Sequence, residues 1–411
     1  MFCKAPFSYI GLNAGGVIQP CCINSLDIPY ADNQSLHDIW FGKEYDDMRK
    51  SMVAGGIPDH YYCRYCFQHR AEASCHARSY DKFIVNENGY PSFLKFSCSN
   101  RCNLKCVMCN EIFSSQHAGY EVNNFLEEEF VSQLDEFIPY LHTVSFSGGE
   151  PLLVKKYLAL AKKIREMAPD ATIHVTTNGT ICTDDVCSIL DDNHLFITVS
   201  LDSINEDVYA SIRQGAHYSK VMENLNIFCG LACQIDVNIC LTTQNLSCLP
   251  ETLFVLSDKG LPVNVIAAKH PLHLSLFFKK EAFIDRKLRD VKEKVDNATI
   301  AWKGFCHDSY ISASSVLAQI MEYRKNDKDI NKDNAEIRHD FSRLLSNVFS
   351  EGRKNKDVEK ILRPLPLSLF TRKFADNFFE FNSVHDLRKL VSCSNGTIQD
   401  FIISNAFYLS I

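Results

Sequence analysis

The chain has 411 residues, of which 46% are hydrophobic and 23% are charged, a balance that is ordinary for a soluble globular protein. Its formal net charge of −7 gives no reason to expect binding to nucleic acid or to an anionic membrane. No stretch approaches the about 18 to 20 apolar residues of a membrane span, and the N-terminus lacks the charged head and apolar stretch of a signal peptide. We therefore expect a cytoplasmic protein with neither a nucleic-acid nor a membrane partner.

Cysteine is the unusual residue in this composition, because 18 are present and ten of them precede residue 110. In a reducing compartment so many thiols indicate metal or redox chemistry more than disulfides. The N-terminal quarter is therefore the expected metal-binding part.

The two ends of the chain differ from its middle. The first 80 residues are rich in Gly, Pro, Asn and Cys, and we expect residues 1–85 to form a small irregular domain shaped by its cysteines. Charged amphipathic stretches over 279–298 and 334–352 predict that residues 273–411 are mainly helical. No motif in this last region indicates a role.

From residue 92 onwards, strand-length apolar stretches alternate with longer amphipathic ones. This alternation predicts a parallel α/β unit, and six strands are too few for a full eight-stranded barrel. We therefore predict a partial (β/α)6 barrel over residues 90–272, with its chemistry at the carboxyl ends of the strands. The expected strands lie at 92–98, 142–147, 172–178, 195–202, 236–243 and 262–268, and two of the expected helices at 154–168 and 218–231.

Three cysteines follow the first expected strand with the spacing C-x3-C-x2-C: Cys102, Cys106 and Cys109. Three thiolates can hold three irons of a [4Fe–4S] cluster and leave the fourth iron open to a substrate or cofactor. Cys98 does not fit this spacing, because the next cysteine would have to stand at Lys105. The alternative is a zinc site, which prefers four closed ligands.

A second motif ends the next expected strand. Gly148, Gly149 and Glu150 precede Pro151; the two glycines allow backbone to approach a ligand closely, and the glutamate supplies an anion for an ammonium group. Alone this motif is typical of a tight turn. One β/α unit after the three cysteines, it is a much more specific signal.

Together these motifs resemble the radical S-adenosylmethionine (SAM) superfamily, over about residues 92–270. The resemblance extends to Thr177-Asn178-Gly179-Thr180 after the third strand and to Arg213. It extends also to Ser200-Leu201-Asp202-Ser203 after the fourth strand, where Ser203 replaces the usual glycine. Met108 stands where the family often has an aromatic residue and still offers an apolar flank to adenine.

The resemblance implies a role for each matching residue. Cys102, Cys106 and Cys109 are the expected ligands of the SAM-binding [4Fe–4S] cluster. Gly148, Gly149 and Glu150 are expected to meet the amino group of SAM, Ser200 and Arg213 its carboxylate, and Asn178 its ribose. Each of the last three has an alternative as a capping or ion-pairing residue at a strand end.

A second group of cysteines, Cys3, Cys21, Cys63 and Cys66, surrounds Gly16 and a "SLHDIW" segment. This order resembles the twitch (half-SPASM) domain, which usually follows the barrel and here precedes it. The resemblance implies an auxiliary [4Fe–4S] cluster with four protein thiolates, and the alternative is a structural zinc ion. Cys22 and Cys75 compete as ligands.

The resemblance also implies the chemistry. Reductive cleavage of SAM at the cluster yields a 5′-deoxyadenosyl radical, which abstracts hydrogen from an unactivated carbon; the auxiliary cluster relays electrons or positions the substrate. An electron donor such as flavodoxin or ferredoxin is expected, together with a small-molecule or peptide substrate that no residue identifies. The alternative is a non-catalytic iron–sulfur or zinc-stapled scaffold. Candidates for lesser roles are Cys306 and Cys393 as hydrogen-atom donors, and His270 and His273 at the site opening.

Overall fold

The computed structural model describes most of the chain up to residue 326 and single positions beyond it. The described residues are 3–14, 16–21, 28–29, 34–58, 63, 66–67, 76–269, 271, 273–277, 282–301, 307–326, 341–342, 345, 358, 361–362 and 402. The chain divides into two compact units, of which the first is Met1–Leu201 with Ala210–Val237, and the second is Asp202–Tyr209 with Asn238–Ile411.

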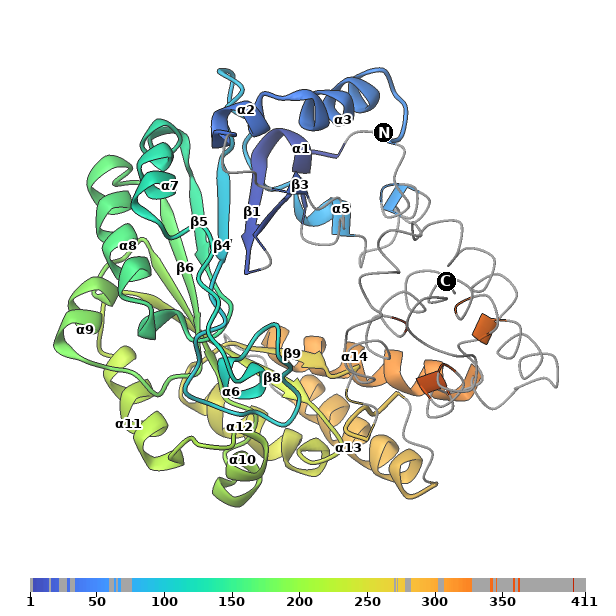
Figure 1. Cartoon of the computed structure of the whole chain (residues 1–411). Helices are drawn as coiled ribbons and strands as arrows, with labels where there is room; N and C mark the ends of the chain where they lie inside the picture. The colour runs from blue at the N-terminus through green and yellow to red at the C-terminus, as the bar shows by residue number, and fades with distance from the viewer. Residues whose placement is uncertain are drawn as a thin grey trace. The chain divides into compact units, whose positions relative to one another are not determined.

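The described strands form one sheet in the order β3-β2-β1-β4-β5-β6-β7-β8-β9 (Figure 1). Strands β4 to β7 pair in parallel with consecutive order, as a series of right-handed β/α crossovers requires. The strands are β1 (Tyr9–Asn13), β2 (Val17–Gln19), β3 (Ile28–Pro29), β4 (Phe93–Ser97), β5 (Thr143–Phe146), β6 (Thr172–Thr177), β7 (Leu195–Ser200), β8 (Gln234–Leu241) and β9 (Val263–Ala267). The six predicted strands correspond to β4–β9, and the predicted mixed α/β class with a partial barrel is confirmed.

Helices follow the strands. They are α1 (Ala5–Ser8), α2 (Leu36–Trp40), α3 (Lys43–Val53), α5 (His76–Ser79), α6 (Ser115–Ala118), α7 (Glu128–Gln133), α8 (Lys155–Met167), α9 (Asp184–Leu190), α10 (Glu206–Ile212), α11 (Tyr218–Phe228), α12 (Leu249–Asp258), α13 (Ala282–Ala301) and α14 (His307–Asn326). The helices predicted at 154–168 and 218–231 are confirmed as α8 and α11. No described helix is both long and apolar enough to cross a bilayer.

Alternating burial along the strands separates the two faces of the sheet. In β4, β5 and β6 every second residue is fully buried, as expected when side chains point alternately to opposite faces. The ring of Tyr157 in α8 packs 6.1 Å from Phe96 and 5.1 Å from Phe146 between centroids, so the buried face lies under that helix. Figure 1 shows α8 and α9 alongside these strands.

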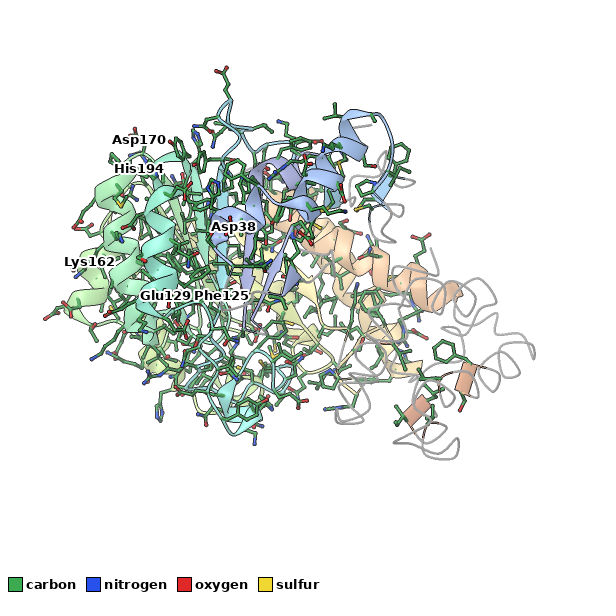
Figure 2. All side chains as sticks on the ribbon, turned by 45° about the horizontal axis from the view of Figure 1, so that its top comes forward. Asp38, Phe125, Glu129, Lys162, Asp170 and His194 are labelled. Carbon is green, nitrogen blue, oxygen red and sulfur yellow. The ribbon has the colours of Figure 1, made fainter. Side chains whose placement is uncertain are left out.

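The outer surface of this unit is polar. Glu129 on α7 and Lys162 on α8 are exposed, as are Asp170 and His194 in the turns that precede β6 and β7. Figure 2 labels all four on the ribbon. Helix α8 therefore presents a charged face to solvent and an apolar face to the sheet, the pattern that stabilises a surface helix.

The prediction of an irregular N-terminal region is wrong for the described part of residues 1–85. Strand β1 pairs in parallel with β4, with Tyr9 opposite Phe93 and Asn13 opposite Ser97, and β2 and β3 continue the sheet in antiparallel pairs. The first four residues of β1 are all buried, so the strand lacks the polar–apolar alternation that would reveal it. Pairing with a distant strand decides its conformation.

In the second unit α13 overlaps the helix predicted over 279–298. Arg324 on α14 donates to the Asp285 carboxylate on α13 at 2.6 Å and to the Leu276 carbonyl at 2.9 Å. This buried contact joins the two helices. The helix predicted over 334–352 falls largely outside the described residues.

Candidate functional site

The three-cysteine loop leaves the carboxyl end of β4 and is held by its own following segment. The Cys102 N–H donates to Ser115 Oγ at 3.1 Å, and Ser114 Oγ donates to the Leu104 carbonyl at 2.9 Å. The His117 ring nitrogen lies 2.9 Å from the Cys106 carbonyl. These contacts satisfy loop backbone groups that no regular structure would pair.

The same loop is fastened to the segment that connects α10 and α11. The Lys105 N–H donates to the Gln214 carbonyl and the Val107 N–H to the Ile212 carbonyl, each at 2.9 Å. Arg213 lies between these two acceptors, and its Nη1 is 4.0 Å from Cys106 Sγ. A guanidinium beside a thiol favours the thiolate, which is the form that binds metal.

The three thiols influence one another. Burial raises the pKa of Cys102, and it raises the pKa of Cys109 to about 11, with a further increase from the charge of Cys106 and an opposing effect of Arg213. Among the described residues, no three His, Cys, Asp or Glu side chains are placed to share one metal ion. A [4Fe–4S] cluster offers a separate iron to each thiolate and accepts a wider spacing. The donor set of three cysteines on one loop therefore fits such a cluster.

The two glycines after β5 permit a close approach of two backbones. Gly148 has φ 81° and Gly149 has φ 55°, a region that residues with a Cβ avoid. A Cβ on Gly149 would lie 2.3 Å from the Arg101 carbonyl oxygen. The Glu150 N–H donates to that same oxygen at 2.7 Å. The glycines thus bring this turn directly onto the cysteine loop.

The Glu150 side chain is fully buried and faces the end of β6. Its carboxylate accepts from the Leu152 N–H at 3.1 Å, from Thr177 Oγ1 at 2.7 Å and from the Asn178 N–H at 2.6 Å. Burial raises its pKa, whereas these three bonds and the charge of Arg213 oppose the increase. The carboxylate therefore links the turns after β5 and β6.

Asn178 connects the third strand end to the cysteine loop. Its Nδ2 donates to Asn103 Oδ1 at 3.0 Å and lies 4.0 Å from Cys102 Sγ. Asn103 in turn donates to Thr180 Oγ1 at 2.9 Å. Two of the three predicted cluster cysteines thus have a polar group from another part of the barrel at 4.0 Å.

Ser200 is the last residue of β7 and is half-buried. Within the described part of the chain, no side-chain hydrogen bond joins it to the loops above. It stands two residues beyond Thr198, which belongs to a row of hydroxyl side chains on the half-buried face of the sheet. That row is Ser97, Ser147, Thr176 and Thr198, where Ser97 Oγ and Ser147 Oγ are 2.7 Å apart and Thr176 is in register with Thr198.

The next row toward the amino ends of the strands differs in composition. The register places Lys95, Ser145, His174 and Phe196 side by side. The rings of His174 and Phe196 stack with centroids 5.1 Å apart, and burial lowers the pKa of His174.

The N-terminal cysteines are only partly described. Cys3 and Cys21 are half-buried against the aromatic cluster of Ala5, Tyr9 and Tyr80. Burial, with a contribution from the charge of Cys3, raises the pKa of Cys63 to about 12. Cys66 is half-buried as well.

Other predicted residues fall elsewhere. Cys98 is fully buried and its thiol contacts the Leu12 carbonyl at 3.7 Å, so it is a core residue. His273 is exposed in the second unit. Cys22, Cys75, Cys306, Cys393 and His270 lie outside the described residues.

Sequence reasoning missed the residues that shape the cysteine loop. Asn100 donates to the carbonyls of Glu111 and Tyr120 and accepts from the Val122 N–H at 2.8 Å. Hydrogen bonds to the backbone of the cysteine loop also come from Ser114, Ser115 and His117. The only available signal was the density of Asn, Ser and His around the cysteines, which is common in loops.

Comparison with known families agrees with this geometry. Residues 96–256 match the radical SAM superfamily, and residues 3–67 match SPASM, an iron–sulfur cluster-binding domain. These matches identify a radical SAM domain over the barrel and a SPASM domain on its N-terminal side. The predicted membership and the predicted cofactors, a [4Fe–4S] cluster with SAM and an auxiliary iron–sulfur cluster, are confirmed at the level of these domains. The assignment of individual ligands stays a prediction.

Two curated relatives match part of the sequence. A GTP 3′,8-cyclase of Clostridium botulinum (strain Okra / Type B1) is 29% identical over 139 residues, and a probable GTP 3′,8-cyclase of Methanocella arvoryzae is 32% identical over 138 residues. Each alignment covers 33% of this chain and 42% of the relative. The chain thus matches less than half the length of these relatives.

Two solved structures show a weak similarity to this chain. One is anSMEcpe with bound AdoMet, at 18% identity and a TM-score of 0.40, covering 51% of this chain and 59% of that one. The other is Streptococcus suis SuiB bound to the precursor peptide SuiA, at 17% identity and a TM-score of 0.41, covering 67% of this chain and 55% of that one.

Proposed function

We propose that this chain is an enzyme that cleaves SAM reductively at a [4Fe–4S] cluster held by Cys102, Cys106 and Cys109 and then oxidises or rearranges a polar substrate. The observation that supports it best is the convergence of three strand-end segments on the cysteine loop. Asn178 approaches Cys102, Arg213 approaches Cys106, and the Gly149 turn abuts Arg101. When bound, the cluster and SAM supply an electron and a 5′-deoxyadenosyl radical that removes hydrogen from an unactivated carbon.

The residues of the chain bind and orient these groups. Because the Glu150 carboxylate is engaged by Leu152, Thr177 and Asn178, the peptide carbonyls of Gly148–Glu150 are the proposed acceptors for the SAM ammonium group. Arg213 and Ser200 are the proposed partners of the SAM carboxylate, and Asn178 that of the ribose. Each of these groups is a dipole or charge that can be oriented before SAM binds, which strengthens its interaction with the ligand.

The hydroxyl row supports a polar substrate. Ser97, Ser147, Thr176 and Thr198 carry hydroxyl groups that can both donate and accept hydrogen bonds, although Ser97 and Ser147 also bond to each other and Thr198 bonds to the Asp236 side chain. A small molecule with hydroxyl groups or a peptide side chain would satisfy them. The stacked rings of His174 and Phe196 lie in the next row of the sheet.

Cys3, Cys21, Cys63 and Cys66 are the proposed ligands of the auxiliary cluster. The packing of Cys3 and Cys21 on one aromatic cluster and the interaction of Cys3 with Cys63 support this set. Four thiolates close such a cluster. Its proposed role is to relay an electron or to hold the substrate.

Iron and sulfide content after anaerobic reconstitution tests both sites. We expect about eight irons per chain for two [4Fe–4S] clusters, and about four in either the Cys102/Cys106/Cys109 triple alanine variant or the Cys3/Cys21/Cys63/Cys66 quadruple alanine variant. SAM should shift the EPR spectrum of the quadruple variant but not of the triple variant. A Cys229→Ser variant, changed at an exposed thiol, is the matched control. Zinc without a response to SAM would overturn the assignment.

Formation of 5′-deoxyadenosine after chemical reduction tests the reaction. The wild-type protein and the quadruple variant should form it, and the triple variant should not. Transfer of deuterium from labelled polar candidates into 5′-deoxyadenosine would then identify the substrate. Absence of 5′-deoxyadenosine from protein with intact clusters would favour the non-catalytic alternative.

A further inference from the structure

Two cysteines outside both proposed cluster sites have their sulfur atoms in contact. Cys182 Sγ and Cys187 Sγ are 2.9 Å apart. Cys182 immediately precedes Thr183, the N-cap of α9, and Cys187 lies within that helix, where its N–H donates to the Thr183 carbonyl at 2.8 Å. Both side chains are half-buried, so small reagents can reach them.

The spacing of these sulfurs distinguishes a disulfide from a metal site. Two thiolates on one tetrahedral zinc ion, each about 2.3 Å from it, lie about 3.8 Å apart. The observed 2.9 Å is shorter, and the remaining approach to a disulfide bond of about 2.05 Å is under about 1 Å. A pair that binds one metal ion would have to separate, whereas a pair that forms a bond has only to close.

We propose that Cys182 and Cys187 form a reversible dithiol–disulfide pair that fastens the loop between β6 and α9. The oxidant is a low-molecular-weight disulfide. One thiolate attacks it and releases a thiol, and the second thiolate displaces the other half. One S–S bond forms in the protein, one S–S bond breaks in the oxidant, and two protons and two electrons pass to the two released thiols.

The two thiols affect each other's titration. Burial, the hydrogen bond to Cys187 and the charge of Cys187 together raise the pKa of Cys182 to about 12. Because the two thiols interact this closely, either can attack the oxidant first, and the other then resolves the mixed disulfide.

The position of the pair links it to the cysteine loop. Cys182 stands two residues after Thr180, whose hydroxyl accepts from Asn103. Closing the bond joins α9 covalently to a segment that contacts the loop of Cys102, Cys106 and Cys109. The pair stands on its own geometry, and its test does not depend on the clusters.

Two further thiols compete with this pairing. Burial raises the pKa of Cys233 to about 11, and the charges of Asp191, Cys229 and Cys187 contribute to it, so Cys229 and Cys233 lie near α9. Trypsin digestion distinguishes these two pairings, because it places Cys182 and Cys187 in a different peptide from Cys229 and Cys233. Peptide 166–213 contains only Cys182 and Cys187, whereas peptide 221–259 contains Cys229, Cys233, Cys240 and Cys248.

Disulfide mapping of the full-length chain tests the proposal. The protein is reduced, equilibrated anaerobically with mixtures of reduced and oxidised glutathione, alkylated with iodoacetamide and digested. We expect peptide 166–213 to lose two hydrogens and escape alkylation as the buffer becomes oxidising, and to recover on reduction. In Cys182→Ser and Cys187→Ser this product should disappear, whereas Cys229→Ser should retain it.

Three results would overturn the proposal. The first is a glutathione adduct on Cys182 or Cys187 of the wild-type chain without internal bond formation. The second is a link between peptides 166–213 and 221–259. The third is zinc or iron that the wild-type chain retains and that both serine variants lose.

Discussion

Glu150 Oε2 accepts the backbone N–H of Asn178 at 2.6 Å, so the turn after β5 and the turn after β6 share one buried carboxylate. Neither residue is near the other in sequence. The relationship makes the glutamate a structural member of the site, because three donors from two strand ends converge on it. Its removal would leave those donors buried without a partner.

We expect Glu150→Ala to lower the free energy of unfolding by about 2 to 3 kcal/mol, since it removes hydrogen bonds to a buried charged group. Urea unfolding of the cluster-free chain measures this. Glu121→Ala is the matched control, because Glu121 forms an exposed pair with Arg101 and should contribute no more than about 1 kcal/mol. Equal effects of the two variants would contradict a structural role for Glu150.

Gly149→Ala should be far more disruptive than an ordinary glycine substitution. A left-handed backbone costs a residue with a Cβ about 1 to 2 kcal/mol, and the new Cβ would also meet the Arg101 carbonyl at 2.3 Å. Gly119→Ala is the control, with φ 78° and no atom within 4 Å of its Cβ position. In urea unfolding, Gly119→Ala should lower the free energy of unfolding only by the cost of the left-handed backbone, because its new Cβ meets no other atom. A similar loss for both would argue against close contact of the two loops.

The environment of Glu136 leads us to expect a small loss of folding stability at acidic pH. Its carboxylate accepts from Tyr90 Oη at 2.6 Å and lies 2.6 Å from the His37 ring; the Tyr90 bond in particular lowers its pKa. A lowered folded-state pKa contributes stability above the unfolded value of 4.5, and this stability is lost as the pH falls through the folded value.

Glu136→Gln should therefore destabilise the chain by less than about 1 kcal/mol at pH 7, because the group is largely exposed. The difference from wild type should vanish near pH 3. Thermal unfolding between pH 3 and pH 7 measures it, with Glu128→Gln on α7 as the control. If the stability difference between Glu136→Gln and wild type instead grew as the pH fell, the predicted direction of the Glu136 pKa shift would be wrong.

The buried ion pair of Arg324 and Asp285 should couple α13 and α14 energetically. The guanidinium is buried and hydrogen-bonded to the carboxylate at 2.6 Å, so Arg324→Leu should cost about 3 kcal/mol by leaving Asp285 without its charge partner. A double-mutant cycle with Asp285→Leu should give a coupling energy of about 1 to 3 kcal/mol. The more exposed Lys292 and Asp296 pair should give about 0.5 kcal/mol or less. Coupling of equal size in both pairs would contradict the importance of burial.

Local patterns were enough to predict the barrel and to propose site residues. Alternating apolar positions between amphipathic helices predicted β4–β9, because strand and helix periods depend on residues close in sequence. The spacing of Cys102, Cys106 and Cys109 is likewise a local pattern, and their role as cluster ligands stays a prediction. Glycines at 148 and 149 were visible as a motif, although their contact with Arg101 was not.

The sequence by itself determined the class of fold and the two domain families, and it supplied the prediction of the cluster cysteines, because each of these is encoded in short segments. Tertiary structure alone decided that β1 extends the sheet beside β4, that Glu150 turns toward Thr177 and Asn178, and that Asn100 holds the cysteine loop. These features depend on strand register and on hydrogen bonds between residues far apart in sequence. The hydrophobic pattern of a short segment does not specify which strand will lie beside another, because strand order follows from how the whole chain buries its apolar surface.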